Sequence, residues 1–245
     1  RGAAAKIICN LILGPTTASA LVADAAPYSD VPTTHTFAGY IAYCQKEGII
    51  SGYADGTFRP ANTLTGYAFM KMLLGALGYD AEVEQYTGAN WSINVAKRAL
   101  NIGLDDDLVG DFNGVKAVTR EEACLYALNT MTADMVEYDA KTTVSTNGTT
   151  VVIAGSKAKE MVNNGNSDGK VFDKDGVMQF AEKYFDNLSV KTGSDDFSRP
   201  ANVWKLKAEE IGTYTNAADA TYTAEVKAST IYKDQIRRAS CRERV

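Results

Sequence analysis

The sequence has few of the residues that catalysis and metal binding usually need. Its 245 residues include one histidine, His35, and four cysteines. A nucleophile–histidine site would have to use His35, and a zinc site lacks enough ligands. Cys9, Cys44, Cys124 and Cys241 form no CxxC pair and have no metal-like spacing. We therefore expect no catalytic residues, no cofactor and no disulfide framework. We expect the first three cysteines to be small hydrophobic residues on buried helix faces.

Long apolar runs and excess positive charge are also missing. No apolar run approaches the ~20 residues that a membrane span needs, and the formal net charge is −5. This charge disfavours a nucleic-acid partner, whose phosphates attract basic surfaces. The 45% hydrophobic content is enough for a real core.

The last ten residues differ from the rest of the chain. Ile236–Val245 carries four Arg and one Glu and shows no apolar periodicity, so the remainder has a net charge of −8. We interpret these residues as a non-native tail, because they resemble a translated sequencing adapter.

The most informative stretch is Gly48–Pro60, which reads GIISGYADGTFRP. It lies between two segments with helical apolar spacing, Thr36–Glu47 and Thr65–Leu77. The dipeptide Asp55-Gly56 favours a tight turn, and Pro60 prevents a helix from continuing through the stretch. A rigid loop between two helices is therefore expected.

Two aromatic residues, Tyr53 and Phe58, are expected to anchor this loop by burying their rings. His35 precedes the first helix, where we favour a capping or packing role over catalysis.

This helix–GYADGTFRP–helix unit resembles the S-layer homology repeat, a family that holds bacterial surface proteins to the cell wall. The second helix of the unit, Gly66–Leu74, has two further copies, at Arg120–Asn129 and at Arg1–Asn10. The first helix recurs at Trp91–Ile102. A repeat of this kind cannot bury its apolar face alone, which explains why several copies occur.

The repeats divide the chain as follows. We expect a truncated first repeat over residues 1–26, a second repeat over 27–82 and a degenerate third repeat over 83–136. A small α+β module of unknown role would occupy 137–235, before the tail at 236–245. An alternative for residues 3–26 is a secretory signal peptide, but the short apolar run, interrupted by Asn10, favours the repeat.

The third repeat keeps only part of the pattern. Its loop, Asp105–Gly114, retains acidic residues, Gly and one aromatic ring but loses the Tyr and Pro. Thr119 and Glu122 predict a capping box at the start of its second helix. The second repeat has Gly66 where the other two have Arg, so we expect its groove to bind weakly or to serve in packing.

The module after residue 137 shows no family motif. Two β-branched runs around Asn147-Gly148 predict a hairpin, and helices are expected at Ser156–Val162 and Gly176–Leu188. Alternation over Phe197–Tyr214 and the composition of Ala220–Ile231 indicate strands. One Asn/Asp-rich loop weakly fits a calcium site, with Asn164, Asn166, Asp168 and Asp175 as ligands, although a solvated turn is the simpler interpretation.

The resemblance implies a mainly α fold in which three repeats pack about a pseudo-threefold axis. It implies noncovalent anchoring of an exported protein, outside the cell, through cell-wall polysaccharide linked to peptidoglycan. Other S-layer subunits are further candidate partners. The alternative is the anchoring region of a surface enzyme whose catalytic part lies in or beyond the C-terminal module.

The resemblance also indicates polymer-binding residues. Arg120 follows a helix N-cap, where the helix dipole disfavours a cation, so a ligand would explain it. Arg1 occupies the equivalent position. Trp91 is a candidate for stacking on a sugar ring, with a core role as the simpler alternative. The loop adds four further candidates: Gly52, Tyr53, Asp55 and Arg59.

Overall fold

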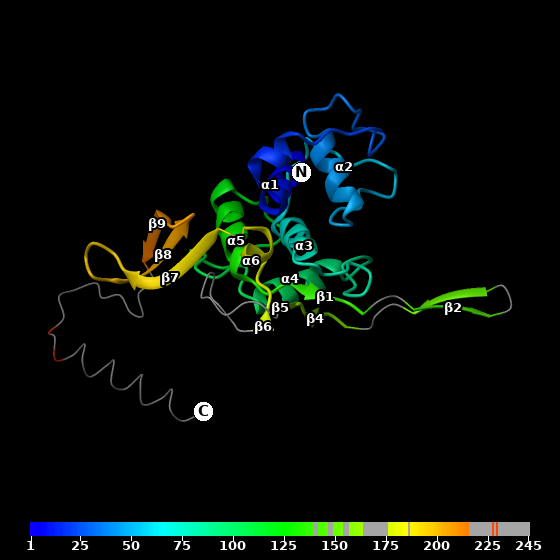
Figure 1. Ribbon diagram of the computed structural model, residues 1–245. Coiled ribbons are helices and arrows are strands. Elements are labelled where there is room, and N and C mark those ends of the chain that lie inside the picture. The colour runs from blue at the N-terminus through cyan, green and yellow to red at the C-terminus, as the bar shows by residue number, and fades with distance from the viewer. Residues whose placement is uncertain are drawn as a thin grey trace.

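The computed structural model describes residues 1–139, 157–163, 176–185 and 187–215, with 227 and 229 as single positions, and gives the backbone of 142–146 and 149–153. Five helices come first, and short antiparallel strands with a sixth helix follow (Figure 1). The first five helices are α1 (Gly2–Ser19), α2 (Ala38–Lys46), α3 (Gly66–Ala76), α4 (Trp91–Asn101) and α5 (Arg120–Thr132). The fold is therefore partly helical, with a small α+β region after the repeats.

The predicted repeat helices are all present, and threonine side chains cap the starts of α3 and α5. The Thr119 hydroxyl accepts the Glu122 N–H at 3.1 Å, and the Glu122 carboxylate accepts the Thr119 N–H, which confirms the capping box. His35 Nδ1 accepts the N–H of Phe37, the residue before α2, at 3.1 Å. Its ring also lies 5.9 Å from that of Phe37, which agrees with packing, one of the two roles expected for His35, while no side chain caps α2 itself.

Helix α1 belongs to the same core as the later repeats. It packs against α2 and α3, and it buries Ala5, Ile8 and Cys9 completely. A kink occurs at Gly14, whose φ of 73° leaves the helical range just before Pro15. This burial is what the repeat interpretation of the segment requires.

Helix α3 is the centre of the core. It also contacts α4 and α5, and Figure 1 shows it between the α1–α2 pair and α4. Phe69, Met70, Leu73 and Leu74 of α3 are fully buried. At roughly 1.5–3 kcal/mol for each large apolar side chain, burial of this helix holds the repeats together.

The core continues past the boundary expected near residue 137. Strand β1 (Val136–Glu137) begins with a hydrogen bond from the Val136 N–H to the Leu77 carbonyl, 3.0 Å long. Helix α6 (Phe180–Tyr184) places the fully buried Phe180 in the same cluster as α3. The start of the C-terminal region is thus packed onto the repeats.

The structure corrects two helix predictions in this region. In place of the helix at Ser156–Val162, the described residues form β4 (Lys159–Glu160), paired with β1, and β5 (Val162–Asn163). The helix expected at Gly176–Leu188 shortens to α6, because β6 (Gly176–Val177) pairs with β5 and Gly176 has a φ of 86°. Strand pairing has overridden the helical spacing in both places.

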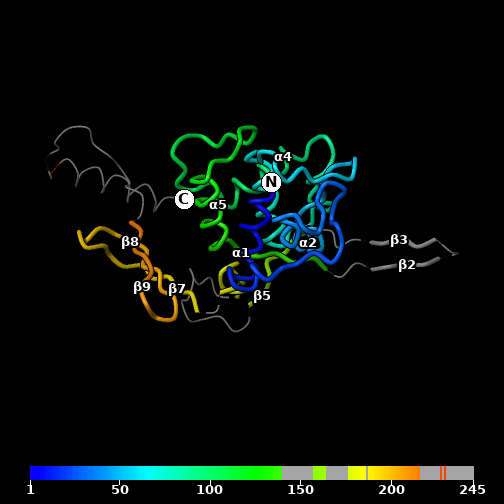
Figure 2. Tube along the Cα trace, turned by 90° about the horizontal axis from the view of Figure 1, so that it is seen from above, coloured from blue at the N-terminus to red at the C-terminus, as the bar shows by residue number. Residues whose placement is uncertain are grey.

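The strands expected further along are partly confirmed. β2 (Thr142–Thr146) and β3 (Thr149–Ile153) pair antiparallel, as the Asn-Gly signal predicts. β7 (Leu188–Ser194), β8 (Pro200–Leu206) and β9 (Glu209–Thr215) form a three-stranded sheet at one side of the repeat helices (Figure 2). The calcium-loop candidates and the tail lie outside the described residues, as does nearly all of Ala220–Ile231.

The cysteines also differ from expectation at one position. Cys9 and Cys44 are buried, but Cys124 is exposed. The buried face of α5 follows Ala123, Tyr126 and Ala127, and Cys124 lies about 100° around the helix from Ala123. The expectation of three buried cysteines is therefore wrong for Cys124.

The Gly48–Pro60 loop is anchored by one ring instead of two. Phe58 is 1% exposed and stacks on Tyr28, with ring centroids 5.3 Å apart. Tyr53 is 39% exposed, so the expectation that it is buried is wrong. Its backbone nevertheless fixes the turn, because Tyr53 accepts the Gly56 N–H and donates to the Thr57 carbonyl.

Asp30 holds the far side of this loop. Its carboxylate accepts the N–H of Phe58 at 2.8 Å and the N–H of Arg59 at 2.7 Å. Desolvation alone would raise the pKa of Asp30, but these backbone hydrogen bonds outweigh it and hold the pKa below its ordinary value. The ionised carboxylate is therefore the form that stabilises the loop.

We predict that Phe58→Ala lowers the free energy of unfolding by about 3–5 kcal/mol, because it leaves a cavity beside Tyr28. Chemical denaturation at equilibrium measures this loss. Tyr53→Ala, at the exposed ring of the same loop, is the matched control and is expected to cost much less. A loss below ~1 kcal/mol for Phe58→Ala would mean that the ring is not a core anchor.

We predict that Asp30→Asn destabilises the protein at neutral pH by about 1 kcal/mol, because the amide keeps one acceptor oxygen and loses the charge. The folded pKa of Asp30 is lowered, so its stabilisation is present above the unfolded pKa of ~3.9 and disappears as pH falls through the folded pKa. Thermal unfolding of both proteins between pH 2 and 7 measures the difference. A difference that does not shrink at low pH would contradict this role for the carboxylate.

Candidate functional site

A pocket of about 590 Å³ lies between the start of α1, the Gly48–Pro60 loop, α3 and the start of α4. Its walls combine cations, aromatic rings and hydroxyl groups. The lining side chains with these properties are Arg1, Ser51, Tyr53, Phe58, Thr63, Thr65, Lys71, Tyr86, Thr87 and Trp91. No Asp or Glu is among the described residues that line it. The pocket is thus suited to a ligand that carries both negative charge and hydroxyl groups.

Arg1 is held at the rim by the loop. Its Nε donates to the Phe58 carbonyl at 2.8 Å. The guanidinium carbon lies 4.6 Å from the ring centroid of Phe58 and 4.7 Å from that of Tyr53, in cation–π range. The Nη groups of Arg1 make no hydrogen bond to any described residue. These two Nη groups therefore remain available as hydrogen-bond donors, and the bond at Nε fixes the plane of the guanidinium.

Lys71 projects from the middle of α3 and supplies the second cation. Its Nζ donates to the Tyr86 carbonyl at 2.7 Å and lies 5.7 Å from the centre of the Trp91 ring. Burial, followed by the charge of Arg1, lowers the pKa of Lys71. An anion between the two cations would relieve this repulsion.

Gly52 lies where the loop backbone approaches Tyr28, and a residue with a side chain does not fit there. Its φ is 66°, and a Cβ would lie 2.3 Å from Cε1 of Tyr28. The glycine therefore lets the loop backbone close over the Tyr28–Phe58 stack and places Tyr53 at the pocket.

Four of the candidates from the sequence meet at this pocket: Arg1, Gly52, Tyr53 and Trp91. The structure also adds one residue to them, Lys71. Its only sequence signal is that it aligns with Lys6 in the repeat at the start of the chain.

Asp55 and Arg59 are not lining residues. They form an exposed ion pair of 2.7 Å on the loop, and hydrogen bonds from Thr57 and Arg59 lower the pKa of Asp55 to about 2. The Arg59 guanidinium lies 4.3 Å from the Tyr53 ring centroid. This pair therefore supports Tyr53 from outside the pocket.

Arg120 is exposed at the first turn of α5 and is also not a lining residue of this pocket. A binding role for Arg120 would require a separate site, in the third repeat.

At the equivalent position of the second repeat, Gly66 is packed against the third repeat's loop. A Cβ on Gly66 would lie 3.1 Å from the Gly114 Cα, and its N–H donates to the Lys116 carbonyl at 3.0 Å. Next to it, Tyr67 and Phe112 make an edge-to-face contact with centroids 5.7 Å apart. This surface serves in packing, which agrees with one of the two roles expected from the missing Arg.

We predict that Gly66→Arg, which restores the family's residue, destabilises the fold and creates no second site. Even its Cβ has to displace backbone atoms of residues 113–114, at a cost of about 1–3 kcal/mol. Denaturant unfolding measures this loss, and titration with wall polymer measures the number of sites. A stable Gly66→Arg variant with an extra site would contradict the prediction.

Two further properties of the described residues concern metal ligands and membrane-spanning helices. Within the described part of the chain, no three His, Cys, Asp or Glu residues lie together as metal ligands would. No helix in the same residues has the length and apolar character to cross a bilayer.

Comparison with known proteins identifies the segment that carries the loop. Residues 27–66 match the family model of the S-layer homology domain. Over 110 residues, the chain is 27% identical to the middle cell wall protein of Brevibacillus brevis, covering 45% of this chain and 10% of that protein. Over 56 residues it is 38% identical to the surface layer protein of Brevibacillus choshinensis, covering 23% and 5%.

An enzyme is among the relatives as well. The chain is 25% identical to an endoglucanase of a Bacillus species over 188 residues, covering 71% of this chain and 20% of the enzyme. No solved structure matches. The chain thus spans a fifth or less of the length of these relatives. The family match and the surface-protein relatives indicate a place at the cell surface or cell wall. The chain carries a domain of the S-layer homology family, matched at residues 27–66.

Proposed function

We propose that this chain anchors an exported protein to the cell wall by binding an acidic wall polysaccharide in the pocket between α1 and α3. The observation that carries the proposal is the pairing of Arg1 and Lys71 beside Tyr53 and Trp91, with no carboxylate among the lining residues. Each group has a role toward a charged sugar.

The two cations would recognise the negative substituent. Because Nε of Arg1 is held by the Phe58 carbonyl, its Nη groups are oriented to grip a carboxylate with two hydrogen bonds. Lys71 uses one donor on the Tyr86 carbonyl and keeps others for the same anion. Both cations are fixed before the ligand arrives, which reduces the entropy lost on binding.

The remaining walls suit the neutral part of a sugar. The Trp91 ring offers an apolar face for stacking, and the hydroxyls of Ser51, Thr63, Thr65 and Thr87 can exchange hydrogen bonds with sugar hydroxyls. A volume of about 590 Å³ lies within the usual range for small-ligand pockets, ~300–1,000 Å³. The pocket therefore suits a short saccharide unit of a longer polymer.

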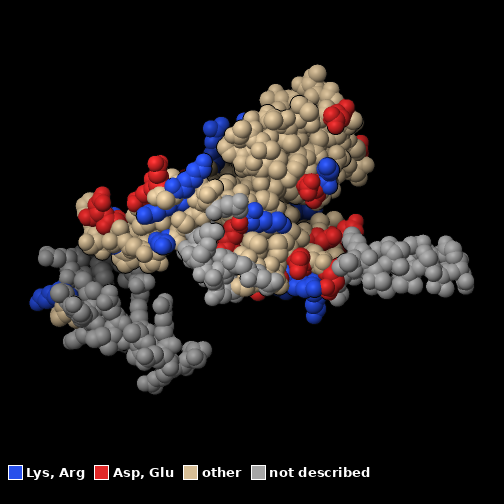
Figure 3. Space-filling model, in the orientation of Figure 1, with Lys and Arg blue, Asp and Glu red and all other residues tan. Residues whose placement is uncertain are grey.

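Local groups have to supply the attraction, because the chain as a whole is acidic. Its net charge is −5, and Figure 3 shows Lys/Arg and Asp/Glu side chains interspersed on the face in view. An anionic polymer is thus repelled at long range and attracted only at close range. This favours a specific site over adhesion by bulk charge.

Several finer features belong to the same proposal. A pseudo-threefold bundle is supported by the packing of α3 against both α1 and α5. Other S-layer subunits remain candidate partners, and Arg120 remains a candidate for a second polymer site. We assign no catalytic role to the described residues.

A second candidate function is the anchoring region of a surface enzyme. The alignment with the endoglucanase favours it, since 71% of this chain is covered. The pocket would keep the same role in such a protein, and catalysis would belong to another part of it. Incubating the full chain with soluble glucans and with peptidoglycan tests this candidate, because turnover would require a catalytic part within the chain.

We predict that Lys71→Met weakens binding to purified acidic wall polymer tenfold or more, which corresponds to ~1.5–3 kcal/mol for a lost charge-assisted hydrogen bond. Calorimetric titration measures the affinity, before and after chemical removal of the acidic substituents. Lys6→Met is the matched control: Lys6 occupies the equivalent repeat position, is exposed and lies outside the pocket. Removing the acidic groups should reduce parent binding below the level of Lys71→Met, because Arg1 then loses its partner as well.

Two arginine variants complete this experiment. Arg1→Ala should lose at least as much affinity as Lys71→Met, and Arg1→Lys should recover only part of it, because an ammonium cannot make the two-pronged contact. Arg120→Ala tests the third repeat separately. If Arg120→Ala alone loses affinity while Lys71→Met binds like the parent, the pocket is not the polymer site.

A further inference from the structure

Two of the cysteines meet in the core although 35 positions separate them in the sequence. The Sγ of Cys9 on α1 lies 3.7 Å from the Sγ of Cys44 on α2, and both residues are fully buried. Cys9 Sγ also lies 3.5 Å from the Tyr40 carbonyl oxygen, and Cys44 Sγ lies 3.7 Å from that of Ala5. The two thiols thus occupy one site at the junction of the two helices.

We propose that Cys9 and Cys44 form a reversible disulfide that joins α1 to α2 once the chain reaches an oxidising compartment. A disulfide needs its sulfurs at about 2.05 Å, so the two side chains have to approach by less than 2 Å. Disulfides persist at cell surfaces and are rare in the reducing cytosol. The place of this family at the surface supplies that setting.

The reaction balances with a small disulfide oxidant of the glutathione type. One cysteine thiolate attacks the oxidant, forming a mixed disulfide and releasing one oxidant thiol. The second cysteine thiolate then attacks the protein sulfur of the mixed disulfide and releases the second oxidant thiol. The protein loses two electrons and two protons, and the oxidant disulfide is reduced to two thiols.

The timing of the reaction follows from the burial of the pair. The hydrogen bond with Cys9 and burial both raise the pKa of Cys44, and both sulfurs are fully buried, so a dissolved oxidant does not reach the docked pair. The bond should therefore form during folding, before α1 is fully packed on α2. Once formed, it is shielded from reductants by the same packing.

The bond would have a large effect on stability, because it links positions far apart in the chain. Cross-linking residues 9 and 44 restricts the unfolded ensemble over a closed loop of about 36 residues. For a chain of this size we expect the Tm of the oxidised form to exceed that of the reduced form by about 5–15 °C.

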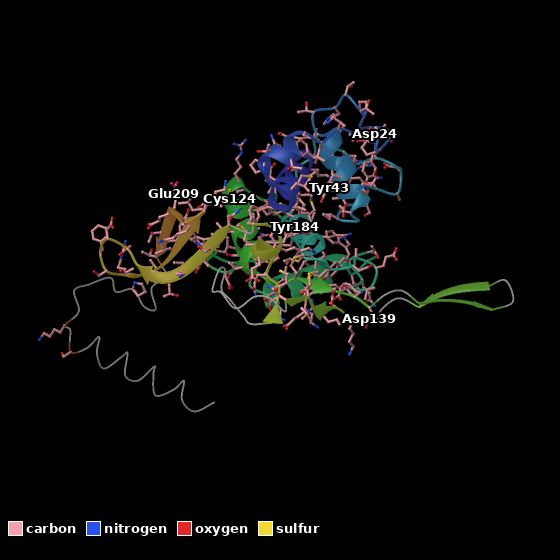
Figure 4. All side chains as sticks on the ribbon, viewed as in Figure 1. Asp24, Tyr43, Cys124, Asp139, Tyr184 and Glu209 are labelled. Carbon is pink, nitrogen blue, oxygen red and sulfur yellow. The ribbon has the colours of Figure 1, made fainter. Side chains whose placement is uncertain are left out.

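Cys124 provides an internal control. Figure 4 shows it on α5, and its side chain is exposed. It has no cysteine partner among the described residues. A general tendency of the chain to oxidise would involve Cys124 first, whereas a preformed pair would involve Cys9 and Cys44 alone.

The experiment refolds the full chain from denaturant in a glutathione redox buffer and then alkylates free thiols under denaturing conditions. Peptide mass spectrometry should find a Cys9–Cys44 linked peptide, with Cys124 alkylated. Adding dithiothreitol at the Tm of the oxidised form should unfold it. Cys9→Ala and Cys44→Ala should each abolish the link and the Tm response to reductant, while Cys124→Ala retains both.

Two results would overturn the proposal. One is complete alkylation of both Cys9 and Cys44 in a sample that has refolded in the oxidising buffer. The other is a Tm response to reductant that persists in Cys9→Ala, which would assign the disulfide to another pair. If an alanine variant fails to fold, the alkylation pattern of the parent chain still decides between these outcomes.

Discussion

The pocket depends on the docking of the first turn of α1 onto the carbonyl groups of the Gly48–Pro60 loop and the residues after it. The main-chain nitrogens of Arg1 and Gly2 donate to the carbonyls of Asn62 and Pro60, and Arg1 Nε donates to Phe58. A helix start has N–H groups without intrahelical partners, and these carbonyls satisfy them. This docking thus joins the first two repeats in the core, and it also fixes the Arg1 guanidinium at the rim of the pocket.

The same repeat position has two different surroundings in this chain: it lines a pocket at Arg1 and is packed against a neighbouring loop at Gly66. At Arg1 the main chain docks on the loop region through hydrogen bonds to Asn62 and Pro60, and the long side chain lines the pocket. At Gly66 the absence of a side chain lets the backbone of Gly114 approach to within 3.1 Å of a would-be Cβ. The aromatic contact between Tyr67 and Phe112 then fills the remaining space. The two junctions thus share the same backbone docking, at 2.9 Å for both the Gly2–Pro60 and the Tyr67–Gly114 hydrogen bonds, and differ in the side chain that lies beside it.

The sequence predicts the repeat helices and the turn well, because their signals are local. The capping box of Thr119 and Glu122 can be read from four consecutive residues, and the turn at Asp55-Gly56 can be read from two. The sequence fails where distant segments decide: β4 and β5 form because strands from other parts of the chain pair with them. Likewise, Tyr53 lies between the guanidinium groups of Arg1 and Arg59 instead of in the core, and the contact between Cys9 and Cys44 exists only in the folded chain.

The sequence predicts those residues of the candidate pocket that lie at recognisable repeat positions. Arg1, Gly52, Tyr53 and Trp91 belong to repeat positions, whereas Lys71 becomes significant only because the Tyr86 carbonyl and the Trp91 ring draw its ammonium into the pocket. Burial, followed by the charge of Arg1, lowers the pKa of Lys71. In the proposed function, an anion bound between the two cations would offset their repulsion. A chain with a net negative charge would in this way favour an acidic polymer at one place while repelling it elsewhere, so attachment would depend on the geometry of the pocket.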